Sequence, residues 1–569
     1  MSVFVLGFPD AEADDTNHGD DEHNNINRAH KGFPGSYSCL WGRGGAIQQP
    51  AMFLRKGRVR LRTWFATFGG DGSGRRPFLP ATETISHWRR ELVGVVCKPL
   101  PMHARRMKPA AFFSILAALF LAPLKPAVHG RRAPDPFAPG DVWCALGDET
   151  THHGDYLALI ELFYRTRFPG MSLQVVNAGL HGDTAGSAIG RLAWDVEPHE
   201  PTVVSILFGM NDIGRTLYTS GPSSPALEQM RADRIDKFGS DLRSLVARVK
   251  STGARVILLS PTIYDETVQS PAPLNRGANA ALARCAQIVR DVANESGAAF
   301  IDLHAKMAEA NARLQAENPL ASIMAANRAE PGPLGHFVAA YAFLRAQNVQ
   351  GIVSRLVIDL ENNVILAADN GVVENVEKSR SSVRFRWTEK ALPFPAPEEM
   401  RAALKLVPFM EELNQQVLII TGLQPGTWDL YIDKELVGSV TAEQMAAGIN
   451  LAMTTNTPQY RQAVEIQRLV VRKAELVADG LRSVALVEQR LAPDAERPID
   501  ITFMEPLVED WKSKVGPETL NTPLGRSVSL YLLRKDREAE AAASVRRLTE
   551  LAELAATPQP HDFELILRR

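Results

Sequence analysis

The sequence contains little cysteine. Four cysteines, at positions 39, 97, 144 and 285, are spread over 569 residues, with no CxxC pair and no Cys/His spacing. This pattern excludes a disulfide framework and gives no indication of a zinc site. We therefore expect no metal and no cofactor, and we expect Cys144 and Cys285 to be small apolar core residues.

The chain also lacks an excess of charge of either sign. Lys and Arg number 63 against 65 for Asp and Glu, which leaves a formal net charge of −2. A balanced charge provides no electrostatic footprint for nucleic acid or for an anionic membrane surface. With 22% charged and 45% hydrophobic residues, the composition is that of an ordinary soluble protein of two to four domains.

A long apolar run is absent as well. The run from Ala110 to Leu124 is interrupted by Ser114 and Pro123 and is shorter than the about 20 residues that a membrane span needs. Basic residues precede it and small residues follow it, a pattern typical of a secretory signal peptide over residues 107–130. We therefore expect a secreted or periplasmic protein with no stable membrane span. The alternative is a buried hydrophobic helix in a cytoplasmic protein.

The position of this segment is unusual, because a signal peptide stands at an N-terminus. We therefore hypothesise that translation starts at Met102 or Met107, and that residues 1–106 are unstructured or wrongly assigned to the protein. Residues 10–30 mix Asp, Asn and His, and residues 55–90 are rich in Arg and Gly, without periodicity.

From residue 131 to 350, short β-branched runs alternate with longer amphipathic stretches. The predicted strands are Val142–Leu146, Leu173–Asn177, Thr202–Phe208, Arg255–Ser260 and Ala299–Asp302. The predicted helices are Tyr156–Arg167, Ala185–Val196, Ala232–Lys250, Ala280–Glu295, Ala305–Ala316 and Gly335–Gln347. This alternation predicts a five-stranded parallel sheet covered by helices on both faces. A site is then expected beyond the carboxyl ends of the strands.

The pattern changes after residue 350. Residues 351–440 contain six short strand-like runs with turns between them and a helix near Glu398–Leu413, which predicts a small antiparallel β module. Residues 441–569 are mainly helical.

Four sequence blocks span the ends of predicted strands or the start of the last helix of the α/β domain, and each contains polar residues at that point. They read "GDETTHHGDY", "VVNAGLHGDTA", "PTVVSILFGMND" and "EPGPLGHFVAAYAFL". Each block alone has an ordinary explanation as a turn or a helix cap. Their order along the chain and their place at the strand ends favour a functional site.

These blocks resemble those of the GDSL/SGNH hydrolase superfamily, over roughly residues 140–350. The stretches "RLAWDVEPHEPTVV" and "PGPLGH" further resemble secreted bacterial members with a C-terminal extension. The resemblance implies a flavodoxin-like three-layer α/β/α domain, ester hydrolysis, and a small-molecule or polysaccharide ester ligand. The alternative is a coincidental match in another flavodoxin-like module.

In that family a serine follows Gly-Asp in the first block, and an Asp-x-x-His motif supplies the base. Carried over residue by residue, the resemblance places Gly179 and Asn211 at the oxyanion donor positions. The serine position holds Glu149 and the histidine position holds Glu330. The position of the orienting acid holds Asn327. All three triad positions depart from the pattern.

These substitutions remove the usual chemistry. Glu149 has no hydroxyl to attack an ester, and its carboxylate can itself occupy the oxyanion donors. We therefore predict an SGNH-type protein of the cell exterior with impaired or lost serine-esterase catalysis. Its cleft would still bind acetylated carbohydrate or ester ligands, and four nearby side chains are candidates for lining it: Asp148, His181, Asp183 and His336.

An active hydrolase is the alternative. Two carboxylates at the serine and histidine positions, Glu149 and Glu330, would lie close together, so that one pKa rises and the pair shares a proton. Such a pair can also hold a divalent cation. The sequence does not decide whether the chain is an enzyme.

Overall fold

The computed structural model describes residues 132–219 and 223–569. The upstream segment at 1–106 and the signal peptide expected at 107–130 lie outside these residues.

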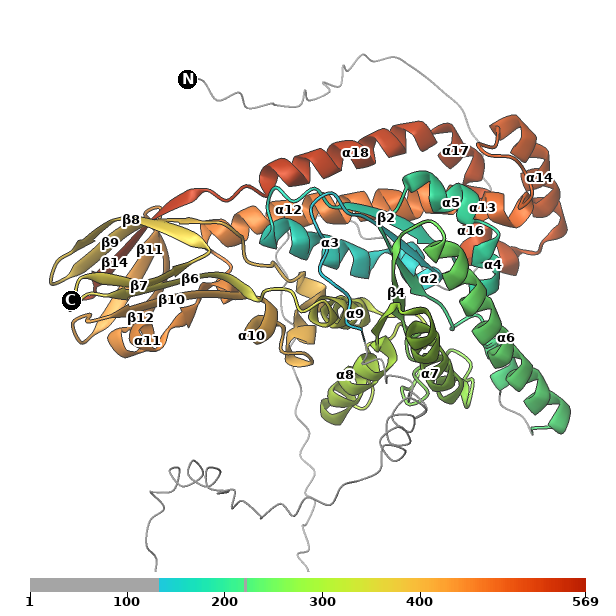
Figure 1. Ribbon diagram of the computed structural model, residues 1–569, viewed down its shortest axis with the longest axis horizontal. Helices are drawn as coiled ribbons and strands as arrows, with labels where there is room; N and C mark the ends of the chain where they lie inside the picture. Colours follow the sequence, from blue (N-terminus) through green and yellow to red (C-terminus); the bar gives the residue numbers. More distant parts are fainter. Residues whose placement is uncertain (1–131, 220–222) are drawn as a thin grey trace, which may run out of the picture. The chain divides into compact units, whose positions relative to one another are not determined.

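The α/β domain is built on a five-stranded sheet (Figure 1). The strands lie in the order β2-β1-β3-β4-β5, and all neighbours are parallel. They are β1 (Val142–Gly147), β2 (Gln174–Gly179), β3 (Val203–Leu207), β4 (Arg255–Leu259) and β5 (Ala299–Ile301). Each of the five predicted strands is confirmed, and no boundary differs by more than two residues.

Helices cover both faces of this sheet. One hydrophobic core joins the sheet to α3 (Asp155–Arg167), α8 (Leu303–Glu317) and α9 (Pro333–Ala346). The other core joins it to α4 (Ala185–Ile189), α5 (Leu192–Asp195), α6 (Pro225–Lys250) and α7 (Ala278–Ser296). Because side chains alternate along a strand, Trp143 faces the first core and Cys144 the second. The three-layer α/β/α fold is confirmed.

Two helices differ from the prediction. The stretch Ala185–Val196 is divided into α4 and α5, and the buried residue Arg191 stands between them in the sequence. Helix α6 begins at Pro225, earlier than the predicted start at Ala232, because Ser224 caps it and a proline fits the first helical turn. Cys144 and Cys285 are buried free thiols, as predicted.

The β module contains two sheets. One has the order β13-β10-β6-β7 and the other β12-β11-β14-β9-β8. Their strands are β6 (Ile352–Asp359), β7 (Val364–Asp369), β8 (Gly371–Lys378), β9 (Ser382–Glu389), β10 (Gln415–Thr421), β11 (Thr427–Ile432), β12 (Glu435–Thr441), β13 (Ile449–Asn450) and β14 (Pro560–Leu567). The short helices η3 (Glu398–Lys405) and α10 (Phe409–Leu413) occupy the predicted helical stretch.

The structure corrects the prediction of a purely antiparallel module. Strands β6 and β10 pair in parallel, because the chain crosses over through η3 and α10 between them. Strand β14, from the C-terminal end of the sequence, pairs with β9 and β11. The proposed domain bounds at 350 and 440 therefore leave β13 and β14 within the segment 441–569, although both strands complete the module.

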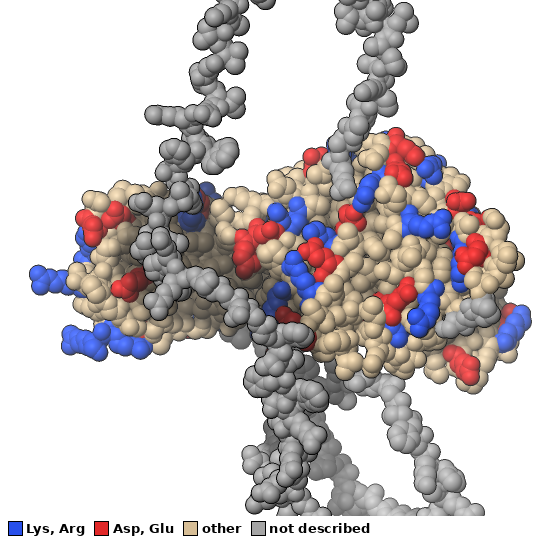
Figure 2. All heavy atoms as spheres, turned by 90° about the horizontal axis from the view of Figure 1, so that it is seen from below, with Lys and Arg blue, Asp and Glu red and all other residues tan. Residues whose placement is uncertain are grey.

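The remaining C-terminal region is helical, as predicted. Its main elements are α11 (Ala442–Ala447), α12 (Pro458–Glu475), the π-helical segment η5 (Leu476–Arg482), α13 (Ser483–Leu491), α14 (Ile501–Lys514), α15 (Pro517–Leu520), α16 (Pro523–Ser529), α17 (Tyr531–Asp536) and α18 (Glu538–Ala555). Helix α12 packs against α3 and α18 (Figure 1). Within residues 132–219 and 223–569, no helix has the length and apolar character of a membrane span. On the face shown in Figure 2, acidic and basic side chains are interspersed.

Candidate functional site

The site begins where β1 ends. Asp148 caps the short helix α2 (Glu149–His153) by accepting a hydrogen bond from the amide of Thr150 at 3.1 Å. Glu149 is the first residue of this helix and is only 2% exposed. Because Glu149 follows the buried strand β1, it lies at the carboxyl edge of the sheet, as the sequence predicts.

The carboxylate of Glu149 is held by two donors from neighbouring strand ends. Asn211 Nδ2, from the loop after β3, donates to Glu149 Oε2 at 2.7 Å. The backbone amide of Gly182, from the loop after β2, donates to the same oxygen at 3.2 Å. Gly182 has φ +72°, a conformation that favours glycine. Residues that follow three different strands, β1, β2 and β3, thus converge at one carboxylate oxygen.

The structure corrects one of the two predicted oxyanion donors. The amide of Gly179 donates to Asn177 Oδ1 at 2.8 Å and so is not directed at Glu149. Gly179 is instead required for packing, since a Cβ there would lie 2.2 Å from the backbone nitrogen of His152. Sequence reasoning missed Gly182. The signal for it was the sequence Gly182-Asp183-Thr184, in which a turn residue stands two positions before the N-cap of α4.

Asp148 and Glu149 place two carboxyl groups side by side in a buried position. Burial, followed by the negative charge of Glu149, raises the pKa of Asp148 well above its usual range. The side chain of Asp148 is used as the helix cap, so the structure gives it a structural role at the site.

The side chain of Asp183 is also occupied. Arg191 Nε donates to Asp183 Oδ2 at 2.8 Å, and the hydroxyl of Ser187 donates to Asp183 Oδ1. The backbone oxygen of Asp183 accepts a second hydrogen bond from Asn211 Nδ2 at 3.1 Å. Asp183 therefore orients the Asn211 amide rather than presenting a free carboxylate to a ligand.

The fourth block forms a tight turn that presents Glu330. Asn327 Oδ1 accepts the amides of Ala329 at 3.1 Å and Glu330 at 3.0 Å. Glu330 Oε1 lies 3.6 Å from His181 Nε2, and both side chains are partly exposed. Burial alone would raise the pKa of Glu330, but the contact with His181 and the charges of His153 and His181 lower it below the usual value. A carboxylate with a lowered pKa is a poor general base.

The alternative hypothesis pairs Glu149 with Glu330. Among the residues that the structure describes, no hydrogen bond or ion pair joins Glu149 to Glu330. The groups with the largest effects on the pKa of Glu330 are its own burial and the neighbours His153, His181 and Asn327. Across residues 132–219 and 223–569, no cluster of three or more His, Cys, Asp or Glu side chains has an arrangement that could hold a metal ion.

His336 lies inside the domain. It is 3% exposed, stacks on Tyr156, and has Nε2 at 3.7 Å from Asp155 Oδ2. Burial lowers the pKa of its imidazole. The structure therefore gives His336 a packing role near the start of α9.

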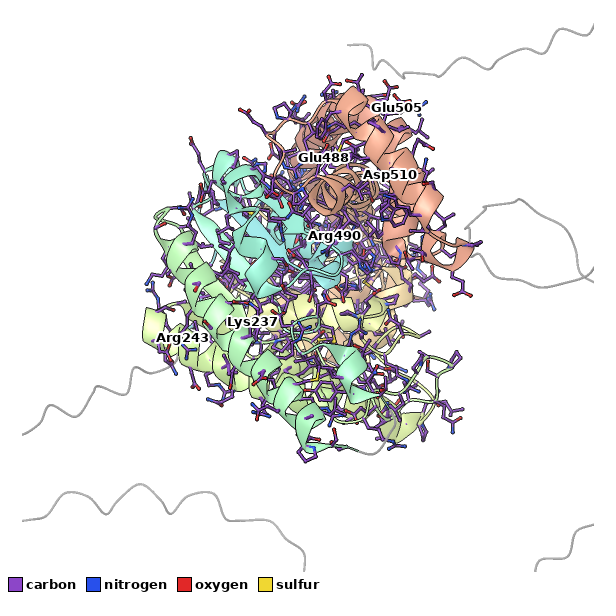
Figure 3. All side chains as sticks on the ribbon, turned by 90° about the vertical axis from the view of Figure 1, so that its right-hand side faces the viewer. Lys237, Arg243, Glu488, Arg490, Glu505 and Asp510 are labelled. Atoms are coloured by element: carbon purple, nitrogen blue, oxygen red, sulfur yellow. The ribbon has the colours of Figure 1, made fainter. Side chains whose placement is uncertain are left out.

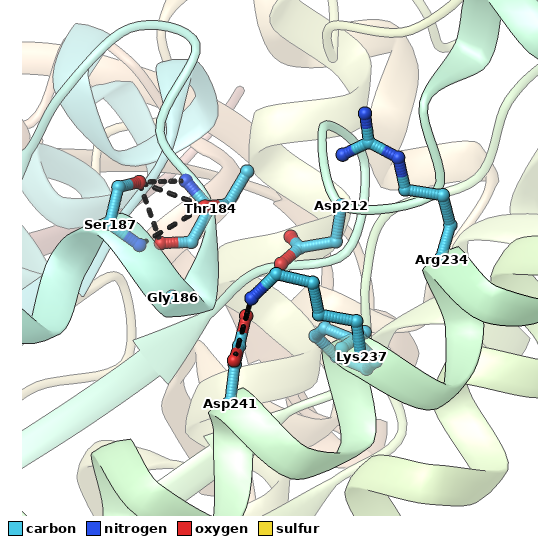
Figure 4. Close-up of a pocket in the computed structure, with 8 residues that line it drawn as sticks. Thr184, Gly186, Ser187, Asp212, Arg234, Lys237 and Asp241 are labelled. Carbon is cyan, nitrogen blue, oxygen red and sulfur yellow. Dashed lines mark hydrogen bonds and ion pairs between the residues drawn. The ribbon is translucent and has the colours of Figure 1, made fainter.

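A surface cavity of about 210 Å³ lies beside the site (Figure 4). It is lined by Thr184, Gly186, Ser187, Asp212, Arg234, Lys237, Phe238 and Asp241. Asp212 follows Asn211 and accepts the amides of Ala185 at 2.9 Å and Gly209 at 3.0 Å. Burial raises the pKa of Asp212 to about 7. The cavity thus borders the loops that hold Glu149, although Glu149 does not line it.

Comparison with known proteins agrees with this geometry. The model of the GDSL-like lipase/acylhydrolase family matches residues 145–336. An acetylxylan esterase of Geobacillus stearothermophilus is 28% identical over 200 residues, which are 35% of this chain and 84% of that protein. A crystal structure of an acetylxylan esterase from the same organism covers 37% of this chain and 96% of its own, at 25% identity and a TM-score of 0.31.

A further solved structure, of a gut microbial diltiazem-metabolizing enzyme, is similar over a much longer stretch. It is 28% identical with a TM-score of 0.68, and the match covers 77% of this chain and 100% of that one. The similarity therefore extends well beyond residues 145–336. The four blocks, the sheet order and the family match agree, and residues 145–336 of this chain are a GDSL-like lipase/acylhydrolase domain.

Proposed function

We propose that this chain is a GDSL-like protein of the cell exterior that has lost serine-esterase catalysis and binds acetylated carbohydrate or another ester ligand. The observation that carries the proposal is the pair of hydrogen bonds from Asn211 and Gly182 to the carboxylate of Glu149. Asn211 holds the position at which the family resemblance places an oxyanion donor, and Gly182 is the second donor in this chain.

Three requirements of ester hydrolysis by a serine triad are unmet. Glu149 supplies no hydroxyl, and Glu330 is a weak base because its pKa is lowered. In addition, the donors are already bound to a negative charge that belongs to the chain. A substrate carbonyl would have to displace that carboxylate and leave it buried without its hydrogen bonds, which is costly.

The class of ligand is inferred from the relatives. One is named as an acetylxylan esterase, so an acetylated polysaccharide fragment is the first ligand to test. His181 precedes Gly182, a donor to Glu149, and lies 3.6 Å from Glu330. We expect a ligand to contact these two partly exposed side chains and the exposed Asn327. The location at the cell exterior rests on residues 107–130, and N-terminal sequencing of the mature protein tests it.

An acyl ester assay tests the loss of catalysis. The unchanged chain should hydrolyse a short-chain acyl ester no faster than the buffer does. The triple variant Glu149→Ser, Asn327→Asp, Glu330→His should gain turnover, since it restores nucleophile, acid and base beside intact donors. The variant Glu149→Ser alone is the matched control and should lack efficient turnover, because no base has been restored.

Turnover by the unchanged chain that disappears in Glu149→Gln would contradict the proposal and favour carboxylate catalysis. Binding is measured separately, by calorimetric titration with acetylated and deacetylated xylo-oligosaccharides. Stronger binding of the acetylated form is expected, and equal or absent binding of both would rule out this ligand class.

A further inference from the structure

The C-terminal helical region reaches the loop that holds Gly182. Arg482, the last residue of η5, is 7% exposed, and its Nε donates to the backbone oxygen of Gly179 at 3.0 Å. Gly179 is the last residue of β2, directly before the loop that carries Gly182. A side chain from outside the family-matched residues 145–336 is thus bonded to the base of this loop.

Arg482 also begins a chain of buried charges. Its two terminal nitrogens donate to the two oxygens of Asp195 at 2.6 and 2.7 Å, a fork-shaped pair that only arginine can make. Asp195 is bonded in turn to Arg191, which contacts Asp183 Oδ2 at 2.8 Å and the backbone oxygen of Gly147 at 3.3 Å. The charges therefore link the helical region to the ends of both β1 and β2.

The winding of η5 explains why Arg482 faces the α/β domain. Lys473, on α12, points to this domain and its Nζ lies 2.8 Å from both oxygens of Glu161. In a regular α-helix of about 3.6 residues per turn, a residue nine positions later would lie on the opposite side. The π-helical segment has wider turns and brings Arg482 back to the side of Lys473.

A second arginine of the same region contacts this loop. Arg490 Nη2, on α13, donates to the backbone oxygen of His181 at 3.1 Å. A Cβ on Gly182 would lie 3.3 Å from the same nitrogen. Figure 3 shows Arg490 where the C-terminal helices meet the α/β domain.

We propose that Arg482 is a positioning residue for the site. It does not touch Glu149 or a ligand; it fixes Gly179 and, through Asp195 and Arg191, Asp183, so that the amides of Gly182 and Asn211 converge on one point. The C-terminal helical region is then part of the site. This inference goes beyond the proposed function, because it holds whether or not the chain turns over an ester.

Amide hydrogen exchange on the full chain tests this role. In Arg482→Met, the peptide covering residues 179–183 should exchange at least about tenfold faster than in the unchanged chain, since the loop loses hydrogen bonds from a charged group. Lys473→Met is the matched control. It removes a buried cation from the same face of the continuous helical stretch formed by α12 and η5. Because Lys473 contacts α3 rather than the loop, exchange in residues 179–183 should stay unchanged.

Both variants are expected to lower the melting temperature, so global stability does not distinguish a positioning role from a purely structural one. Amide exchange in the loop at residues 179–183 does. Unchanged exchange in folded Arg482→Met, or equal acceleration in Lys473→Met, would overturn the proposal. If Arg482→Met does not fold, Arg482→Lys serves in its place. A lysine cannot make the paired hydrogen bonds of the guanidinium, so the loop at residues 179–183 should exchange faster than in the unchanged chain but remain protected. An exchange rate equal to that of the unchanged chain would also overturn the proposal.

Discussion

Asn211 Nδ2 lies 2.7 Å from Glu149 Oε2, so the amide that the family resemblance assigns to the oxyanion hole is bonded to the chain's own carboxylate. Glu149 is buried, and its carboxylate depends on Asn211 and Gly182 for the hydrogen bonds that water would otherwise provide. Under the proposed function, a glutamate at the serine position removes the nucleophile and also fills the place of the substrate oxygen.

A double-mutant cycle should show this dependence as a coupling energy. Asn211→Ala alone is expected to lower the free energy of unfolding by about 1–3 kcal/mol, because it leaves a buried carboxylate with one donor fewer. In a Glu149→Ala background the same change should cost less, and the coupling should be about 1 kcal/mol or more. Urea unfolding measures all four proteins. Additive effects would contradict a direct bond, and the exposed Glu309→Ala paired with Asn211→Ala is the uncoupled control.

Asp212 should make stability depend on pH between about 4 and 7. Its pKa in the folded chain is about 7, above the ordinary value, so the folded state binds this proton more tightly than the unfolded state. The stabilisation is complete below the ordinary pKa and is lost as the pH rises through the folded pKa. Relative to Asp212→Asn, the unchanged chain should lose on the order of 3 kcal/mol between pH 4 and 7. Urea unfolding at several pH values checks this, and a constant difference would contradict it.

The stability that Asp195 provides should depend on pH in the opposite direction. Burial alone would raise the pKa of Asp195, but Arg482 and Arg191 lower it to about 2. Its stabilisation is therefore present above the ordinary pKa and lost as the pH falls through about 2. At pH 7, Asp195→Asn should cost about 3–5 kcal/mol, since it leaves buried arginines uncompensated. Urea denaturation at pH 7 and pH 3 measures how much Asp195→Asn lowers the free energy of unfolding. An equal loss at the two pH values, or a loss below about 1 kcal/mol at pH 7, would be inconsistent with the buried network.

The sequence predicts the α/β domain well because its strands are buried on both faces. Val203–Leu207, for example, is buried at every position, and the polar residues that follow the parallel strands must then lie at one edge of the sheet. The same reasoning places Glu149 and Asn211 together. The family resemblance identifies the wrong glycine as a donor, because the direction of a backbone amide in the loop from Gly179 to Gly182 depends on φ and on packing against α2, which a motif does not encode.

Contacts between distant segments are the part that the sequence pattern does not predict. Strand β14 is separated from β9 by the whole helical region, and no local periodicity indicates that the two pair. Arg482 is likewise one arginine among many in an amphipathic stretch. Its orientation follows from the π-helical winding of η5, and its partner Asp195 lies far away in the sequence.

The most direct test of the central claim uses acetate. Glu149→Ala removes the atoms of one CH₂–COO⁻ group, which is an acetate in size and charge, from beside Asn211 and Gly182. If the native carboxylate fills the oxyanion position, sodium acetate should raise the melting temperature of Glu149→Ala in a saturable manner, beyond the effect of sodium chloride at equal ionic strength, and should leave the unchanged chain unaffected. Equal responses of the two proteins, or no specific response in a folded Glu149→Ala, would contradict the account.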